Sequence, residues 1–276
     1  MAKLLFCLAA PAALAFSQAP DPREIVKRSV AVDQHNDELR RDYTYDLFNE
    51  IRELDAAGKL KSVKSTKVEV VALGAKRLRL LVERDGKPLP QAEARKEKEK
   101  YDKAAQEAAG MSPAETRRRL AAEKRRNDEE REKFKHIPEA FQFTLLGETS
   151  LNGRPAWQIR ATPLKTYSGP YAFLLRNMEG TLWIDKADYA WVRVDAETLD
   201  TVSFGWFFAR IQKGTHFTFE SLKINNEIWA PSKVHFRAGA RIALVKTVRI
   251  DQDVVYSRYR KFQTDSRVVG IDEVGK

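Results

Sequence analysis

Apolar and polar residues alternate with a period of two along much of the chain, which is typical of strands with one buried face. In the first part of the chain, this pattern and its flanking turns predict strands at Tyr43–Leu54, Lys61–Leu73 and Lys76–Arg84. Only short turns separate these segments, and the first turn contains Gly58. Short connections favour antiparallel neighbours, so we predict a meander.

The second half of the chain is almost continuously strand-like, with turns rich in Gly, Asn and Asp. The predicted strands are Phe141–Leu146, Trp157–Thr162, Gly180–Ile184, Trp191–Asp195, Thr201–Gln212, His216–Ile224, Ile228–Phe236, Ala240–Asp251 and Val254–Phe262. No segment of helix length interrupts them, which argues against βαβ units and a parallel sheet. The fold class that we predict is α+β: one large, curved antiparallel sheet with helices on one side.

Two regions have helical patterns instead. Asp21-Pro22-Arg23-Glu24 combines a cap, a proline at the first helical position and an early acidic residue, so we predict a helix from there to about Arg41. Residues 91–136 are dense in charges of both signs, and Ser112-Pro113-Ala114-Glu115 is a capping box that starts a second helix within them. We expect this insert to be a solvated arm that lies along or over the sheet. The alternative is an arm that binds nucleic acid.

The first residues resemble an export sequence. Lys3 is followed by an apolar stretch from Leu4 to Leu14 and then by small residues up to Ala19. This pattern predicts a cleavable signal peptide in residues 1–19, with cleavage between 15 and 19, and hence a periplasmic protein. The alternative is a buried N-terminal helix. The single cysteine, Cys7, would leave with the peptide, so disulfides and cysteine-based zinc sites are excluded.

Charge and composition narrow the function further. The chain has 276 residues, with 49 Lys and Arg against 39 Asp and Glu, and 43% hydrophobic residues. A basic balance is compatible with nucleic acid, but export and the mixing of signs argue against that partner. The four histidines are scattered, and the sequence contains no HExxH or GxSxG motif. We therefore predict no enzyme activity, no catalytic residue, no cofactor and no metal site. An exported hydrolase is the least favoured alternative.

One set of apolar residues is expected to share a face of the sheet. It consists of Val202, Phe204, Trp206 and Phe208 on one strand, and of Leu182, Ile184, Val234 and Phe236 on neighbours. Exposure of each such side chain forfeits about 1.5–3 kcal/mol, so helices or a ligand must cover this face. An ordinary core and an apolar binding cavity are both compatible with the pattern.

Three local motifs resemble a known family. They are Gly180-Thr-Leu-Trp183-Ile-Asp185 followed by Trp191-Val-Arg193-Val-Asp195, Ile228-Trp229-Ala-Pro231 before Val234-His-Phe236, and Tyr256-Ser-Arg-Tyr259-Arg-Lys-Phe262. With the order of elements, they are similar to the periplasmic lipoprotein-sorting (LolA-like) superfamily of carriers and sensors. The resemblance covers about Asp21 to Arg267, but the charged helices at 91–136 are longer than in the carrier proper. It implies an incomplete β-barrel whose concave face is covered by helices and receives acyl chains.

The resemblance also implies a division of the chain and a function. Residues 20–267 would form a single LolA-like domain that contains the insert 91–136, and residues 268–276 a tail. The domain would be a non-enzymatic, monomeric periplasmic carrier for lipoproteins or other acylated ligands. The expected ligand-binding residues are Leu182, Ile184, Val202, Phe204, Trp206, Phe208, Val234 and Phe236, under a lid that includes Ile25, Val26 and Val30. The alternative is a sensor module that binds lipoproteins and a membrane-associated protein partner.

Overall fold

The computed structural model describes residues 20–55, 57–74, 76–204, 209–242 and 246–261. The predicted signal peptide (1–19) and tail (268–276) lie outside the described residues. The strands are β1 (Tyr43–Leu54), β2 (Leu60–Leu73), β3 (Lys76–Arg84), β4 (Lys87–Pro88), β5 (Phe141–Leu151), β6 (Arg154–Pro163), β7 (Met178–Asp185), β8 (Trp191–Thr198), β9 (Val202–Phe204), β10 (Ala209–Ile211), β11 (His216–Ile224), β12 (Ile228–Ile242) and β13 (Lys246–Lys261).

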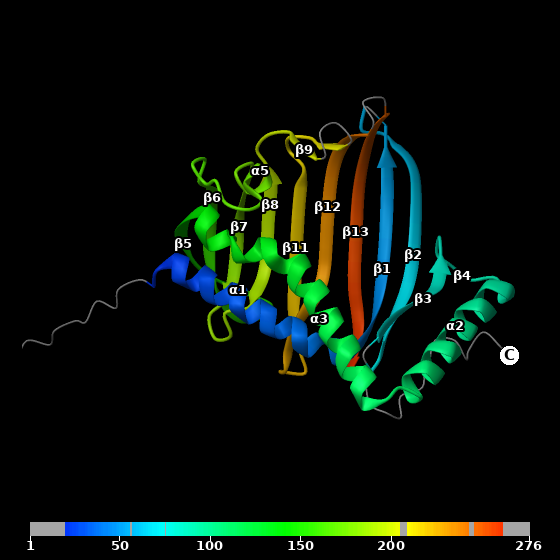
Figure 1. The fold of residues 1–276 in the computed structure, drawn as a ribbon. Coiled ribbons are helices and arrows are strands. Elements are labelled where there is room, and N and C mark those ends of the chain that lie inside the picture. The colour runs from blue at the N-terminus through cyan, green and yellow to red at the C-terminus, as the bar shows by residue number, and fades with distance from the viewer. Residues whose placement is uncertain (1–19, 56, 75, 205–208, 243–245, 262–276) are drawn as a thin grey trace, which may run out of the picture.

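These strands form one open, curved antiparallel sheet (Figure 1). Its order is β4-β3-β2-β1-β13-β12-β11-β8-β7-β6-β5, and the short β10 pairs with β12 and with β9. The first strand β1 thus lies beside the last strand β13, with Phe48 opposite Val255. The predicted fold class, a curved antiparallel sheet covered by helices, is confirmed.

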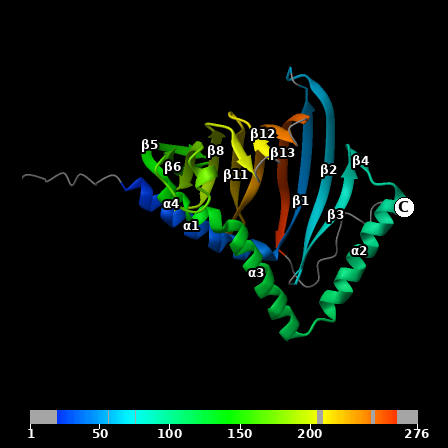
Figure 2. The same cartoon turned by 45° about the horizontal axis from the view of Figure 1, so that its top comes forward.

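The helices are α1 (Pro22–Leu39), the 3₁₀ turn η1 (Arg40–Asp42), α2 (Gln91–Ala109), α3 (Pro113–Lys135), α4 (Ile137–Ala140) and α5 (Ala172–Leu175). Both predicted caps form: the Asp21 carboxylate accepts a hydrogen bond from the Arg23 amide, and the Ser112 hydroxyl accepts one from the Glu115 amide. Helices α1 and α3 cross the concave face of the sheet together (Figures 1 and 2). None of the described helices combines the length and apolar character that a membrane span requires.

Helix α2 covers the opposite face of the sheet, at the β2–β3 edge. Its Tyr101, Ala104 and Ala108 pack on a set of side chains that alternation places on the convex face: Val71, Leu73, Leu78 and Leu80. The insert that was expected to be a solvated arm therefore forms two helices that lie on opposite faces of the sheet. Helix α2 covers the convex face, and α3 crosses the concave face.

Several predicted strand boundaries are wrong, and residues 237–239, which were predicted to separate two strands, lie inside β12. The predicted strand Thr201–Gln212 is two short strands, β9 and β10, which pair with each other so that Val202 lies opposite Ile211. The turn expected between the predicted strands Ala240–Asp251 and Val254–Phe262 does not exist, since Asp251 and Asp253 both lie inside β13. Aspartate is common in turns because its carboxylate bonds nearby amides. Here arginine and histidine side chains on neighbouring strands satisfy the two carboxylates instead.

Candidate functional site

Two rows of side chains cross the concave face where α1 and α3 cover it. Directly opposite residues of paired strands point to the same face. The register therefore joins Leu182, Val194, Phe219 and Val234 in one row across β7, β8, β11 and β12. The next row joins Gly180, Ala196, Phe217 and Phe236.

The second row leaves space over its small members. A Cβ atom on Gly180 would lie 2.5 Å from the carbonyl oxygen of Asp195, so glycine is required for the close approach of β7 and β8. Ala196 lies opposite Gly180, and the large ring of Phe217 follows on the next strand. The sheet surface beneath the helices, which we call the floor, is therefore recessed at β7–β8 and higher at β11.

A cavity of about 400 Å³ fills this hollow. Its lining is mostly apolar: the sheet contributes Phe141, Ala161, Met178, Gly180, Leu182, Trp191, Val194, Ala196, Phe217, Phe219 and Pro231, and the helices contribute Phe134, Ile137, Leu174 and Leu175. Charged residues also line it: Asp33, Arg40, Arg131, Lys133 and Glu179. Cavities of this size and composition are typical of sites for small apolar ligands.

Helix α1 is anchored to the sheet by the protein core. Ile25 and Val26 are 3% and 0% exposed and pack with Trp157, Ile159, Leu182 and Ile184. The Trp191 indole donates a hydrogen bond of 2.5 Å to the Ser29 hydroxyl, and the Trp229 amide donates one of 3.0 Å to Asn36 Oδ1. Moving α1 would expose this core.

Helix α3 is held differently, because none of its residues is fully buried. Its apolar contact with the sheet is Phe134, which packs edge-on against Trp191 with ring centroids 5.9 Å apart. The side-chain contacts between α3 and α1 are polar. Arg131 pairs with Asp33, Lys124 pairs with Glu38, and Asn127 bonds Asp37. Burial lowers the pKa of Arg131. The Lys124–Glu38 pair is exposed and the Arg131–Asp33 pair is partly buried, so these contacts stabilise less than the apolar core beneath α1 does, and α3 can move from the cavity more easily than α1 can.

The predicted ligand-binding residues are distributed between the core, the cavity and segments outside the described residues. Leu182 lines the cavity. Ile184 is 0% exposed in the core under α1, and Val202 is 2% exposed. Val234 and Phe236 are half-buried next to the lining residues Phe219 and Phe217. The backbone of Phe204 belongs to β9, whereas Trp206 and Phe208 lie outside the described residues.

The predicted lid residues do not line the cavity. Ile25 and Val26 belong to the core, and Val30 is half-buried on α1. The residues that cap the cavity are Phe134 of α3, Ile137 of α4, and Leu174 and Leu175 of α5. The alternation of Phe217 and Phe219 with polar residues in β11 could have identified the floor. Phe134 is an isolated aromatic residue in a charged helix, so no pattern marks it.

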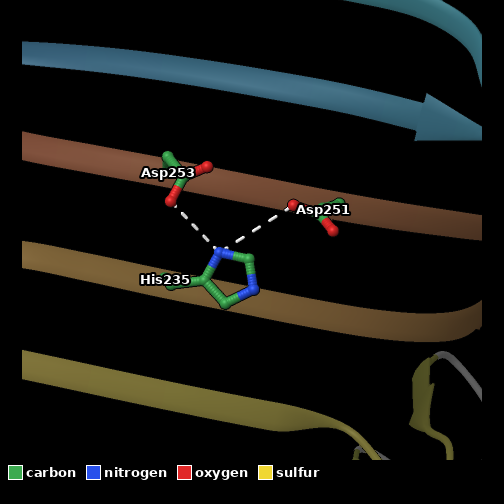
Figure 3. Close-up of side chains that lie close together, drawn as sticks. All are labelled: His235, Asp251 and Asp253. Carbon is green, nitrogen blue, oxygen red and sulfur yellow. Dashed lines mark hydrogen bonds and ion pairs between the residues drawn. The ribbon is translucent and has the colours of Figure 1, made fainter.

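The convex face carries charged side chains, and three of them place atoms of the kind that bind metals within 4.8 Å of one another. His235, Asp251 and Asp253 come from β12 and β13, and the His235 ring nitrogen Nδ1 lies 3.1 Å from Asp253 and 3.8 Å from Asp251 (Figure 3). The Arg52 guanidinium bonds both carboxylates, with 2.7 Å to Asp251. Arg237 bonds Asp251 as well, at 2.9 Å. A cation would have to displace these partners, so the donor set fits an ion-pair network better than a metal site.

This network predicts an acid dependence of stability. Burial of Asp251 opposes its ionisation, but hydrogen bonds from Arg52 and Arg237 outweigh burial and hold its pKa below the ordinary value. A lowered pKa in the folded state stabilises the fold above the unfolded value of about 3.9 and ceases to do so as the pH falls through the folded value. Asp251→Asn should therefore lower the free energy of unfolding by about 2 kcal/mol at pH 7, and the difference from wild type should shrink below about pH 4.

Urea unfolding at a series of pH values measures this difference. Asp102→Asn, an exposed substitution on α2, is the control and should differ little from wild type throughout. An Asp251→Asn difference that stays constant down to the acid limit would show that the carboxylate charge is not what stabilises the strands.

Comparison with known proteins gives structural neighbours only. No protein-family model matches the sequence, and no curated protein matches it. Among solved structures, an outer membrane lipoprotein-sorting protein domain from Vibrio parahaemolyticus matches with a TM-score of 0.34 and 12% identity, over 90% of this chain and 98% of that one. At this level of identity the similarity concerns the fold alone.

Two further neighbours have the same level of similarity. A LolA superfamily protein from Nitrosomonas europaea matches with a TM-score of 0.31 and 8% identity, over 89% of this chain and 95% of that one. A DUF1329 family protein from Desulfovibrio piger matches with a TM-score of 0.32 and 11% identity, over 90% and 96%. TM-scores below 0.5 describe a distant likeness of fold and do not bear on the ligand, which depends on the cavity.

Proposed function

We propose that the protein is a non-enzymatic periplasmic carrier that holds an acyl chain of a lipoprotein or lipid in the cavity beneath α3. The observation that carries this proposal is the apolar cavity of about 400 Å³ between the sheet and a helix that is held by polar contacts. Burial of each methylene contributes about 0.8 kcal/mol to binding. Transfer of an acyl chain from water into this apolar cavity is therefore favourable. Release requires an opening, and displacement of α3 provides one without exposing the core.

The experiment uses a fluorescent palmitoylated peptide and the same peptide without its acyl chain. The protein should bind only the acylated form. Ala196→Phe places a ring in the hollow of the floor and should weaken binding at least about tenfold, because exclusion of two methylenes already costs about 1.6 kcal/mol. Val194→Trp fills the same cavity from the neighbouring row and should have the same effect.

The control is Ala92→Phe, which adds the same ring at an exposed position of α2. It should leave binding unchanged. Equal binding of both peptides, or unchanged binding by both cavity-filling variants in their folded state, would contradict an acyl site in this cavity.

A further inference from the structure

The first half of α3 carries an unusual concentration of positive charge. Of the ten residues 117–126, six are Arg or Lys and one, Glu123, is acidic. Five arginines of this stretch are exposed and form what we call the arginine patch: Arg117, Arg118, Arg119, Arg125 and Arg126. Charge pairs on a helix surface contribute only about 0.2–0.5 kcal/mol each, so the stability of α3 does not require this concentration of arginine.

The patch has few partners within the described part of the chain. Arg119 pairs with Glu115 at 2.9 Å, one turn away on the same helix. The other four guanidinium groups make no ion pair or hydrogen bond with described residues. Arg118 and Arg125 are seven residues apart, about 10 Å along the helix, and the small Ala121 and Ala122 lie between them. The guanidinium groups are therefore free to meet an external surface.

The position of α3 presents the patch outward. The helix contacts α1 through Lys124, Asn127 and Arg131, which lie on one side of it. Arg118 and Arg125 are exposed and lie on a different side of α3 from these three residues. The end where α2 meets α3 projects past the ends of the strands in both views (Figures 1 and 2). A flat partner can therefore reach this end of α3 without meeting the sheet.

We propose that the arginine patch docks the protein on the phosphate groups of an anionic lipid bilayer. One guanidinium group can donate two parallel hydrogen bonds to a phosphate. It is also more weakly hydrated than the lysine ammonium group, so less hydration is lost when it binds a phosphate surface. Each basic residue in a cluster on a helix raises the affinity for an anionic bilayer about fivefold. The choice of a bilayer over another polyanion rests on the proposed function: the same helix carries Phe134 at the cavity, about 24 Å along its axis from Arg118.

The test is co-sedimentation of the full chain with vesicles of phosphatidylcholine alone or with added phosphatidylglycerol. Binding should require phosphatidylglycerol and weaken as salt is raised. The variant R117Q/R118Q/R125Q/R126Q should lose at least tenfold in apparent affinity while it binds the palmitoylated peptide normally. The matched control removes four other exposed cations around α2 and should lose less than threefold: K87Q/R95Q/K96Q/K103Q.

Three results would overturn the docking proposal. They are equal binding to both kinds of vesicle, an equal loss in the matched control, and binding to RNA or an acidic peptide without binding to vesicles. Ala196→Phe separates this proposal from the acyl site, since it should keep vesicle binding while losing the peptide. If wild type binds the peptide but no vesicle, the docking proposal alone fails.

Discussion

Asp185→Ala is expected to lower the free energy of unfolding by about 1.5–3 kcal/mol, because it removes a buried carboxylate that accepts hydrogen bonds from a guanidinium group and from two turn amides. The Asp185 side chain is 1% exposed and ends β7 at the turn into β8. Its carboxylate accepts hydrogen bonds from Arg154 at 2.7 and 3.1 Å and from the amides of Ala187 and Asp188. The substitution therefore leaves a guanidinium group and two turn amides without this partner.

Urea unfolding followed by circular dichroism measures the effect. Asp185→Asn keeps an acceptor for the turn amides but removes the charge, so its loss should be smaller than that of Asp185→Ala. Asp102→Ala on the exposed face of α2 is the control and should change stability by less than about 0.5 kcal/mol. A loss of less than about 1 kcal/mol in Asp185→Ala would mean that the pair is not needed to hold β6 against β7.

The effects of Ile184→Ala and Leu182→Ala should distinguish a residue of the core from a residue of the cavity lining. Ile184 is 0% exposed under α1, so its truncation should cost about 2–5 kcal/mol. Leu182 lies two residues away on the same face but also lines the cavity. Its truncation enlarges existing space, so we expect a smaller loss of stability and tighter binding of longer acyl chains.

The measurements are unfolding free energies and the affinities of peptides that carry acyl chains of increasing length. Ile184→Ala, where it remains folded, should leave the preference for chain length unchanged. An equal loss of stability in both variants, with no change of chain-length preference in Leu182→Ala, would show that the cavity is not where the acyl chain lies.

Local sequence patterns predicted the first elements well. The Asp21–Pro22 cap starts α1 at the expected residue, and β1 and β3 have their predicted bounds. Caps and period-two alternation depend on residues near one another in the chain, so they can be recognised without the fold. The turn between β5 and β6 is also set by local residues, since Asn152 and Gly153 both adopt the positive φ that its hairpin requires.

Long-range partners account for what the sequence could not predict. Asp251 and Asp253 resemble turn residues until Arg52, 199 positions away from Asp251, is known to lie beside them. Val70 and Val71 are both buried because β2 is covered on both faces, one of them by α2. The cavity depends on the contact between Phe134 and Trp191, and Phe134 does not stand out in its charged helix.

The measurement that tests the central claim most directly is mass spectrometry of organic extracts from the protein purified without detergent from its native cells. The account predicts a co-purified molecule with an acyl chain in wild type, and its loss from folded Ala196→Phe but not from Ala92→Phe. The account would be contradicted if Ala196→Phe carried the same acyl compound in equal amount. It would also be contradicted if wild type carried no acyl compound and did not bind the palmitoylated peptide.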